Sequence, residues 1–82
     1  MEDAEIVSLY SSKYNAELAK GVTPNYLGIA REVYAKASGS LSLNASDSKV
    51  VFDSILCAVK ENCGERYVRS TRETLEKLAR AS

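Results

Sequence analysis

The chain has 82 residues, which suffices for one small domain with a modest core and leaves little surface for a deep cleft. It carries 11 basic and 11 acidic side chains, so its net charge gives no general reason to bind nucleic acid or an anionic membrane. No apolar run approaches the roughly 20 residues of a membrane span. The acidic start lacks the apolar stretch of a signal peptide, and we therefore expect a cytoplasmic protein with reduced cysteines and no membrane partner.

Apolar residues that recur at helical spacing predict four helices. The first is expected over residues 3–20, where the apolar positions follow one another at intervals of 3, 4 and 4 residues: Val7, Tyr10, Tyr14 and Leu18. The second is expected over residues 24–38, because Thr23 can cap its start and Pro24 suits its first position. The polar stretch that follows predicts a loop.

The third helix is expected over residues 46–63 and the fourth over residues 65–80, with Gly64 as the stop signal between them. No segment of useful length alternates with a period of two residues, so no sheet is expected. The sequence therefore predicts an all-α fold, in which residues 1–82 form a single domain with about four amphipathic helices.

A phosphatase-like motif begins at Cys63, since Arg69 and Ser70 follow it with the C-x5-R-S spacing of phosphotyrosine phosphatases. In those enzymes the loop joins a strand to a helix, and a histidine precedes the cysteine. Here no strand is predicted, and Asn62 stands in the histidine position. We therefore interpret Cys63 as the last apolar position of the third helix.

Other catalytic, cofactor and metal sites have little support in the sequence. The chain has no histidine, and Cys57 and Cys63 are only two of the four ligands that a structural zinc site needs. No acid–base pair stands out, so we expect no enzyme and no cofactor. The string Asp53-Ser54-Ile55 is similar to the attachment site of acyl carrier proteins, but Ser54 would lie in mid-helix on a neutral chain, and a carrier domain is the less favoured alternative.

Three arginines at intervals of three residues predict a basic strip on the last helix: Arg66, Arg69 and Arg72. Such a strip can bind phosphates or an acidic protein surface. The alternative is a solvated face whose charges are compensated within the helix. The pairs that would do this have i,i+4 spacing: Glu65–Arg69, Glu73–Lys77 and Glu76–Arg80.

Several short motifs occur in an order that points to a known family. Leu27-Gly28-Ile29-Ala30 opens a helix, Lys49 precedes an apolar helix, and Arg72-Glu73-Thr74-Leu75-Glu76 is followed four residues later by Arg80. In this order the chain resembles the small biofilm-development proteins of the YmgB/AriR type, also called two-component-system connector proteins. It departs from them in its two cysteines and in a loop about five residues longer between Ala30 and Lys49.

The resemblance implies a helical, dimeric protein without enzymatic activity that regulates biofilm formation and stress responses by contacting the RcsB response regulator. The family's similarity to Hha nucleoid modulators implies direct DNA binding as an alternative. A dimer also suits the length, because such a chain buries only about 60–65% of its surface alone. Aromatic residues are favoured at interface centres, and they give the candidates for a dimer or partner face: Tyr10, Tyr14, Tyr26, Tyr34 and Tyr67.

Overall fold

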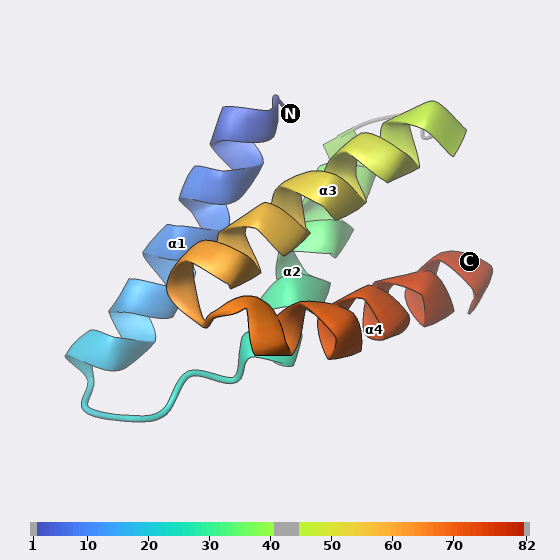
Figure 1. Ribbon diagram of the computed structural model, residues 1–82. Helices are drawn as coiled ribbons and strands as arrows, with labels where there is room; N and C mark the ends of the chain where they lie inside the picture. Colours follow the sequence, from blue (N-terminus) through green and yellow to red (C-terminus); the bar gives the residue numbers. More distant parts are fainter. Residues whose placement is uncertain (1, 41–44, 82) are drawn as a thin grey trace.

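The computed structural model describes residues 2–40 and 45–81, and every regular element in these ranges is helical. The all-α prediction is confirmed, and the helices lie close to their predicted places (Figure 1). The predicted loop falls partly on residues 41–44, which lie outside the described residues. In chain order the elements are α1 Asp3–Ala19, α2 Tyr26–Ser40, α3 Ala45–Asn62, the short 3₁₀ helix η1 Glu65–Tyr67, and α4 Val68–Ala81.

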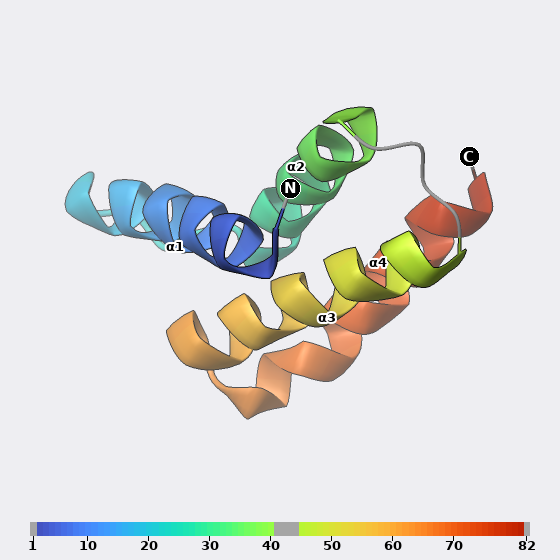
Figure 2. The ribbon, with the colours of Figure 1, turned by 90° about the horizontal axis from the view of Figure 1, so that it is seen from above.

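Helix α3 occupies the middle of the bundle, since it packs against α1, α2, η1 and α4. Seen from above, α4 runs beside α3 while α1 and α2 form the other part of the bundle (Figure 2). The described chain measures 37 × 22 × 19 Å. No helix in the described ranges is long and apolar enough to cross a membrane.

The core draws fully buried side chains from all four α-helices. Helix α3 contributes more of them than any other helix, because its apolar positions recur at helical spacing and neighbours cover it on several sides. Each fully buried aliphatic side chain contributes roughly 1.5–3 kcal/mol relative to an exposed one. The largest fully buried side chains are Tyr10, Ile6, Ile55, Leu75, Val33, Val51, Val59 and Thr71.

The start of α2 differs from the prediction. The helix begins at Tyr26, and its cap is Asn25, whose side-chain oxygen accepts a hydrogen bond from the Gly28 amide at 3.1 Å. A Cβ at position 28 would come within 2.9 Å of the Asn25 side-chain nitrogen, so glycine leaves room for the cap. The predicted cap, Thr23, was wrong because Thr and Asn are both good caps, and only the path of the α1–α2 connection decides between them.

The turn from α3 into η1 is made by Gly64, as predicted. Its φ of 110° lies in the region that favours glycine, and its amide lies 3.2 Å from the carbonyl oxygens of Val59 and Lys60. The turn brings Tyr67 of η1 back toward the end of α3. It therefore sets the position of both Cys63 and the first turn of α4.

The cap assignment predicts a contrast between two substitutions. Asn25→Ala should lower the free energy of unfolding by about 1 kcal/mol, because the Gly28 amide loses its acceptor. Thr23→Ala should change it by less than about 0.5 kcal/mol, as is usual for exposed positions. Urea unfolding followed by circular dichroism measures both, and a larger loss at Thr23 would contradict the assignment.

Candidate partner-binding surface

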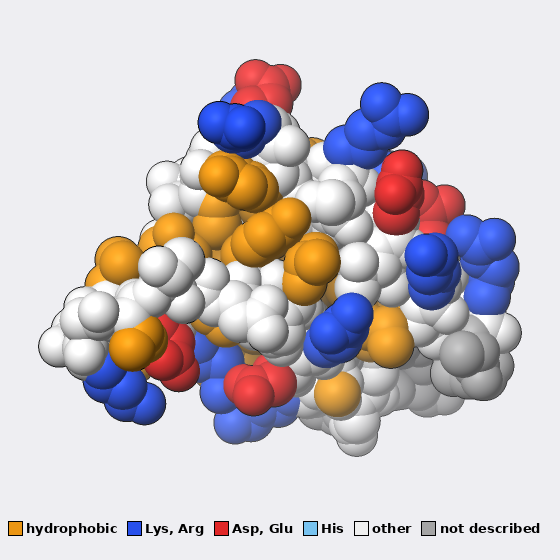
Figure 3. Space-filling view, turned by 90° about the horizontal axis from the view of Figure 1, so that it is seen from below, with side chains coloured by type: hydrophobic (Ala, Val, Ile, Leu, Met, Phe, Trp, Pro, Cys, Tyr) orange, Lys and Arg blue, Asp and Glu red, His pale blue; other side chains and the backbone are white. Residues whose placement is uncertain are grey.

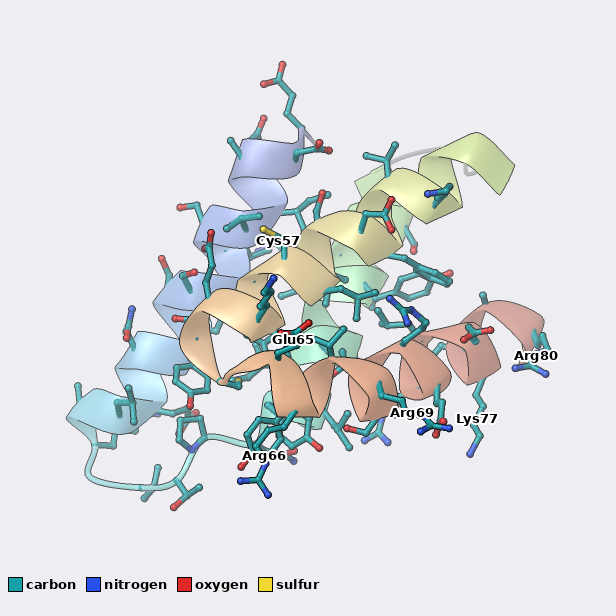
Figure 4. The ribbon with its side chains drawn as sticks, in the orientation of Figure 1. Cys57, Glu65, Arg66, Arg69, Lys77 and Arg80 are labelled. Atoms are coloured by element: carbon teal, nitrogen blue, oxygen red, sulfur yellow. The ribbon has the colours of Figure 1, made fainter. Side chains whose placement is uncertain are left out.

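The three candidate arginines do not form one strip, which corrects the sequence-based prediction. Arg66 belongs to η1, and its guanidinium carbon lies 5.4 Å from the centroid of the Tyr67 ring. Arg69 lies on the outer side of α4 with 90% of its side chain exposed (Figure 4). Arg72 instead lines a hollow between α3 and α4. A step of three residues falls short of a helical turn by about 60°, so the side chains diverge.

The predicted ion pairs on the last helix are also different. Within the described residues, none of the three predicted carboxylate pairs forms. Arg69 Nε instead lies 3.7 Å from Glu73 Oε1, and Arg80 Nε donates to the carbonyl oxygen of Glu76 at 3.3 Å. Exposed pairs of this kind contribute at most about 1 kcal/mol, so these contacts do not prevent Arg69 or Arg80 from pairing with a partner.

Two of the five candidate tyrosines belong to the core of the single chain. Tyr10 is fully buried, and Tyr34 is 8% exposed with its ring centroid 5.7 Å from that of Phe52. Neither ring is exposed enough for a partner to contact it. The other three are half-buried, and for these the assignment to a dimer or partner face stays a prediction: Tyr14, Tyr26 and Tyr67.

These three tyrosines line one hollow of about 350 Å³, which we call the tyrosine hollow. Helix α1, the α1–α2 connection, the start of α2, the end of α3 and η1 all contribute to it. Figure 3 views the molecule from below and shows apolar side chains gathered on this side, with charged side chains around them. The full lining is Tyr14, Thr23, Pro24, Asn25, Tyr26, Cys63 and Tyr67.

Hydrogen bonds and ring contacts fix the walls of the tyrosine hollow. The rings of Tyr26 and Tyr67 meet edge to face with centroids 5.0 Å apart. The Tyr26 hydroxyl lies 2.8 Å from Ser70 Oγ and so joins α2 to α4. The buried Tyr10 hydroxyl donates to the Tyr26 carbonyl at 3.0 Å. The walls are therefore held from three helices.

Cys63 sits among phenol groups rather than cations. Its sulfur lies 3.9 Å from the Tyr10 hydroxyl. Burial raises the pKa of the Tyr10 phenol far above its ordinary value, and the neighbouring Cys63 raises it further. Burial also raises the pKa of Tyr14, with a smaller contribution from Cys63. Arg69 is turned outward on α4, so its guanidinium and the thiol do not form the phosphate-binding loop that the C-x5-R-S spacing would require.

The structure also shows the surroundings of the candidate attachment serine and of the second cysteine. Ser54 is only 5% exposed within α3, so its hydroxyl is poorly placed to carry a prosthetic group. Cys57 is exposed, and its thiol lies 3.8 Å from Glu61 Oε1. Among the residues that the structure describes, no three His, Cys, Asp or Glu side chains are grouped to hold a metal ion.

A second hollow, of about 410 Å³ between α3 and α4, was not predicted from the sequence. Its walls include Phe52 and Leu56 of α3, and Arg72 and Glu76 of α4. Phe52 and Leu56 are four residues apart, as are Arg72 and Glu76, and this spacing indicates that the members of each pair lie on the same face of their helix. The pairing of the two faces depends on how α4 docks on α3, and periodicity within one helix does not reveal this.

Comparisons of the chain with protein-family models, curated proteins and solved structures find no match.

The raised pKa of the Tyr10 phenol leads us to predict that the protein loses stability at alkaline pH. An unfolded tyrosine ionises near pH 10, whereas folded Tyr10 holds its proton to higher pH. Above about pH 10 the unfolded chain thus binds fewer protons than the folded chain, and the free energy of unfolding falls as pH rises. Tyr10→Phe should cost about 1 kcal/mol at pH 7, because the Tyr26 carbonyl loses its donor, yet it should flatten the alkaline fall.

Urea titrations at neutral and alkaline pH measure this difference. Tyr34→Phe is the matched control, since it removes another core phenol and leaves the Tyr10–Tyr26 hydrogen bond in place. The control should keep most of the alkaline fall. An equally steep fall in the Tyr10→Phe variant would show that Tyr10 is not the responsible group.

Proposed function

We propose that this chain is a non-enzymatic regulatory adaptor that acts by protein–protein interaction. The observation that carries the proposal is the placement of exposed Arg66 against Tyr67 at the edge of the tyrosine hollow, with exposed Arg69 following at the start of α4. Tyrosine and arginine are enriched among the few residues that dominate interface energies. A hollow of about 350 Å³ walled by tyrosine rings can receive a partner side chain, and the arginines can pair with carboxylates around it.

The partner is proposed to be a transcriptional response regulator such as RcsB, in the control of biofilm formation or stress responses. This part rests on the resemblance to the connector proteins, carried by the motifs at residues 27–30, 49 and 72–80. We further propose that the adaptor is cytoplasmic and works as a homodimer. A partner with an acidic surface fits the charge of Arg66, which has a ring contact but no ion pair among the described residues.

Titration calorimetry with purified RcsB tests the adaptor proposal. We expect micromolar or tighter binding that Arg66→Glu and Arg69→Glu each weaken by at least about tenfold, because each reversal sets a carboxylate against an acidic surface. Lys77→Glu is the matched control, since it makes the same charge change about two turns beyond Arg69, where Lys77 lines a separate hollow with Arg31 of α2. It should alter the affinity less than about threefold.

Two outcomes would contradict the adaptor proposal in different ways. The absence of heat at any concentration would remove RcsB as the partner. An equal loss with Lys77→Glu would show a general dependence on charge instead of a contact at the tyrosine hollow. Circular dichroism of each variant establishes that the helical fold is retained.

A DNA-binding nucleoid modulator is the second candidate function. It is favoured by the exposed basic groups on the lower side of η1 and α4, where Figure 4 places Arg66, Lys77 and Arg80. The carboxylate of Glu73 interrupts this row, and Arg69 already pairs with it. The interruption lowers the number of phosphates that the face can neutralise, and this is why we prefer the adaptor.

The two functions differ in their response to salt. Affinity for DNA falls with rising salt with a slope near the number of neutralised phosphates. We expect mobility shifts on duplex DNA to be weak, independent of sequence and lost as salt rises to the physiological range. A sequence-specific shift that survives physiological salt and is weakened by Lys77→Glu would favour the DNA modulator over the adaptor.

A further inference from the structure

The hollow between α3 and α4 has an apolar floor and a charged rim. Figure 1 shows the two helices meeting near η1 and diverging toward the C-terminus. Phe52 and Leu56 from α3 and Ala79 from α4 form the apolar part. The rim carries two residues from each helix: Lys49 and Asp53 on α3, and Arg72 and Glu76 on α4.

The charged residues on the α3 side of the rim form an ion pair, whereas those on the α4 side do not. On α3, Lys49 Nζ lies 3.0 Å from Asp53 Oδ2, so these charges neutralise each other. On α4, neither Arg72 nor the Glu76 carboxylate has an ion pair among the described residues, although the two have i,i+4 spacing. The neighbouring pair Arg69–Glu73, which has the same order and spacing, lies 3.7 Å apart. The rim thus presents one unpaired cation and one unpaired anion, four residues apart.

We propose that a second copy of this chain covers the hollow in a two-fold symmetric dimer, with Arg72 of each copy paired to Glu76 of the other. A two-fold axis through the middle of this segment sets the two α4 helices antiparallel. The order of the charges is then reversed in the second copy, so each cation meets an anion. Four residues span about 6 Å along a helix, so one axis position aligns both pairs.

A different occupant would need a different rim. A purely acidic partner would satisfy Arg72 and leave Glu76 facing a like charge, and a basic partner would do the reverse. The chain's own α4 supplies both charges in the complementary order. The apolar floor formed by Phe52, Leu56 and Ala79 supplies the contact area, while the two ion pairs set the register of the helices.

This inference rests on the proposed homodimer and assigns it a face. It also separates the three arginines by role: Arg66 and Arg69 remain with the partner surface, and Arg72 joins the two copies. Self-association then uses the hollow between α3 and α4, and partner binding uses η1 and the start of α4.

Sedimentation equilibrium over a range of protein concentrations tests the proposed face. Arg72→Glu and Glu76→Arg should each weaken self-association by at least about tenfold, because each places like charges opposite one another. The double variant, Arg72→Glu with Glu76→Arg, restores opposite charges and should return within about threefold of the wild-type constant. An equimolar mixture of the two single variants should associate more tightly than either variant alone.

The matched control lies one turn earlier on the same helix. Arg69→Glu, Glu73→Arg and their double variant make the same charge changes on a pair that does not line the hollow, and each should leave self-association within about threefold of wild type. Circular dichroism of every variant establishes that a weaker association does not follow from unfolding.

Each other outcome overturns the inference. If neither single reversal at residues 72 and 76 weakens the dimer, or if the double variant stays as weak as the single ones, the Arg72–Glu76 pairs do not join the copies. If Arg72→Glu weakens binding of RcsB while Glu76→Arg strengthens it, and self-association is unaffected, the hollow binds the acidic partner instead.

The failure of this inference can be told apart from the failure of the proposed function. A wild-type chain that is monomeric at every concentration would remove both the face and the homodimer. The calorimetric titration with the Arg66→Glu and Arg69→Glu variants would still decide whether the chain is an adaptor.

Discussion

The hydroxyl of Tyr10 connects three helices at one point. It extends from α1, donates to the backbone carbonyl of Tyr26 at the start of α2, and lies against the thiol of Cys63 just after α3. A buried phenol has to satisfy its hydroxyl, and here the acceptor is the backbone carbonyl of Tyr26, the first residue of α2. This contact therefore holds α1 against the first residue of α2, at the wall of the tyrosine hollow.

The packing of α4 on the core decides which neighbours its charged residues meet. Thr71 and Leu75 turn inward and fix the helix on the core. Their burial leaves Arg69 on the outer side and Arg72 on the side that faces α3. The two arginines, though near in sequence, meet different surroundings, and this is the physical basis for assigning them to different contacts.

The fold could be predicted largely from the sequence, whereas the candidate sites could be predicted only in part. Helical periodicity, Gly64 and the absence of strand patterns were enough for the elements, because these depend on local geometry. The N-cap at Asn25 instead of Thr23, and the burial of Tyr10 and Tyr34, depend on how neighbouring helices dock. The same holds for Arg72. The sequence of α4 gives the direction in which Arg72 points from the helix axis, but it does not say that α3 lies on that side.

The turn at Gly64 has a consequence for chemical synthesis of the protein. Its φ is 110°, and a Cβ built there would meet no atom within 4 Å, so the backbone conformation alone requires glycine. The mirror image of this conformation lies in the extended region that ordinary L-residues adopt. A D-alanine at position 64 would therefore adopt this φ and ψ without backbone strain. It would restrict the unfolded chain at the corner where α3 turns into η1, and so would favour the folded state.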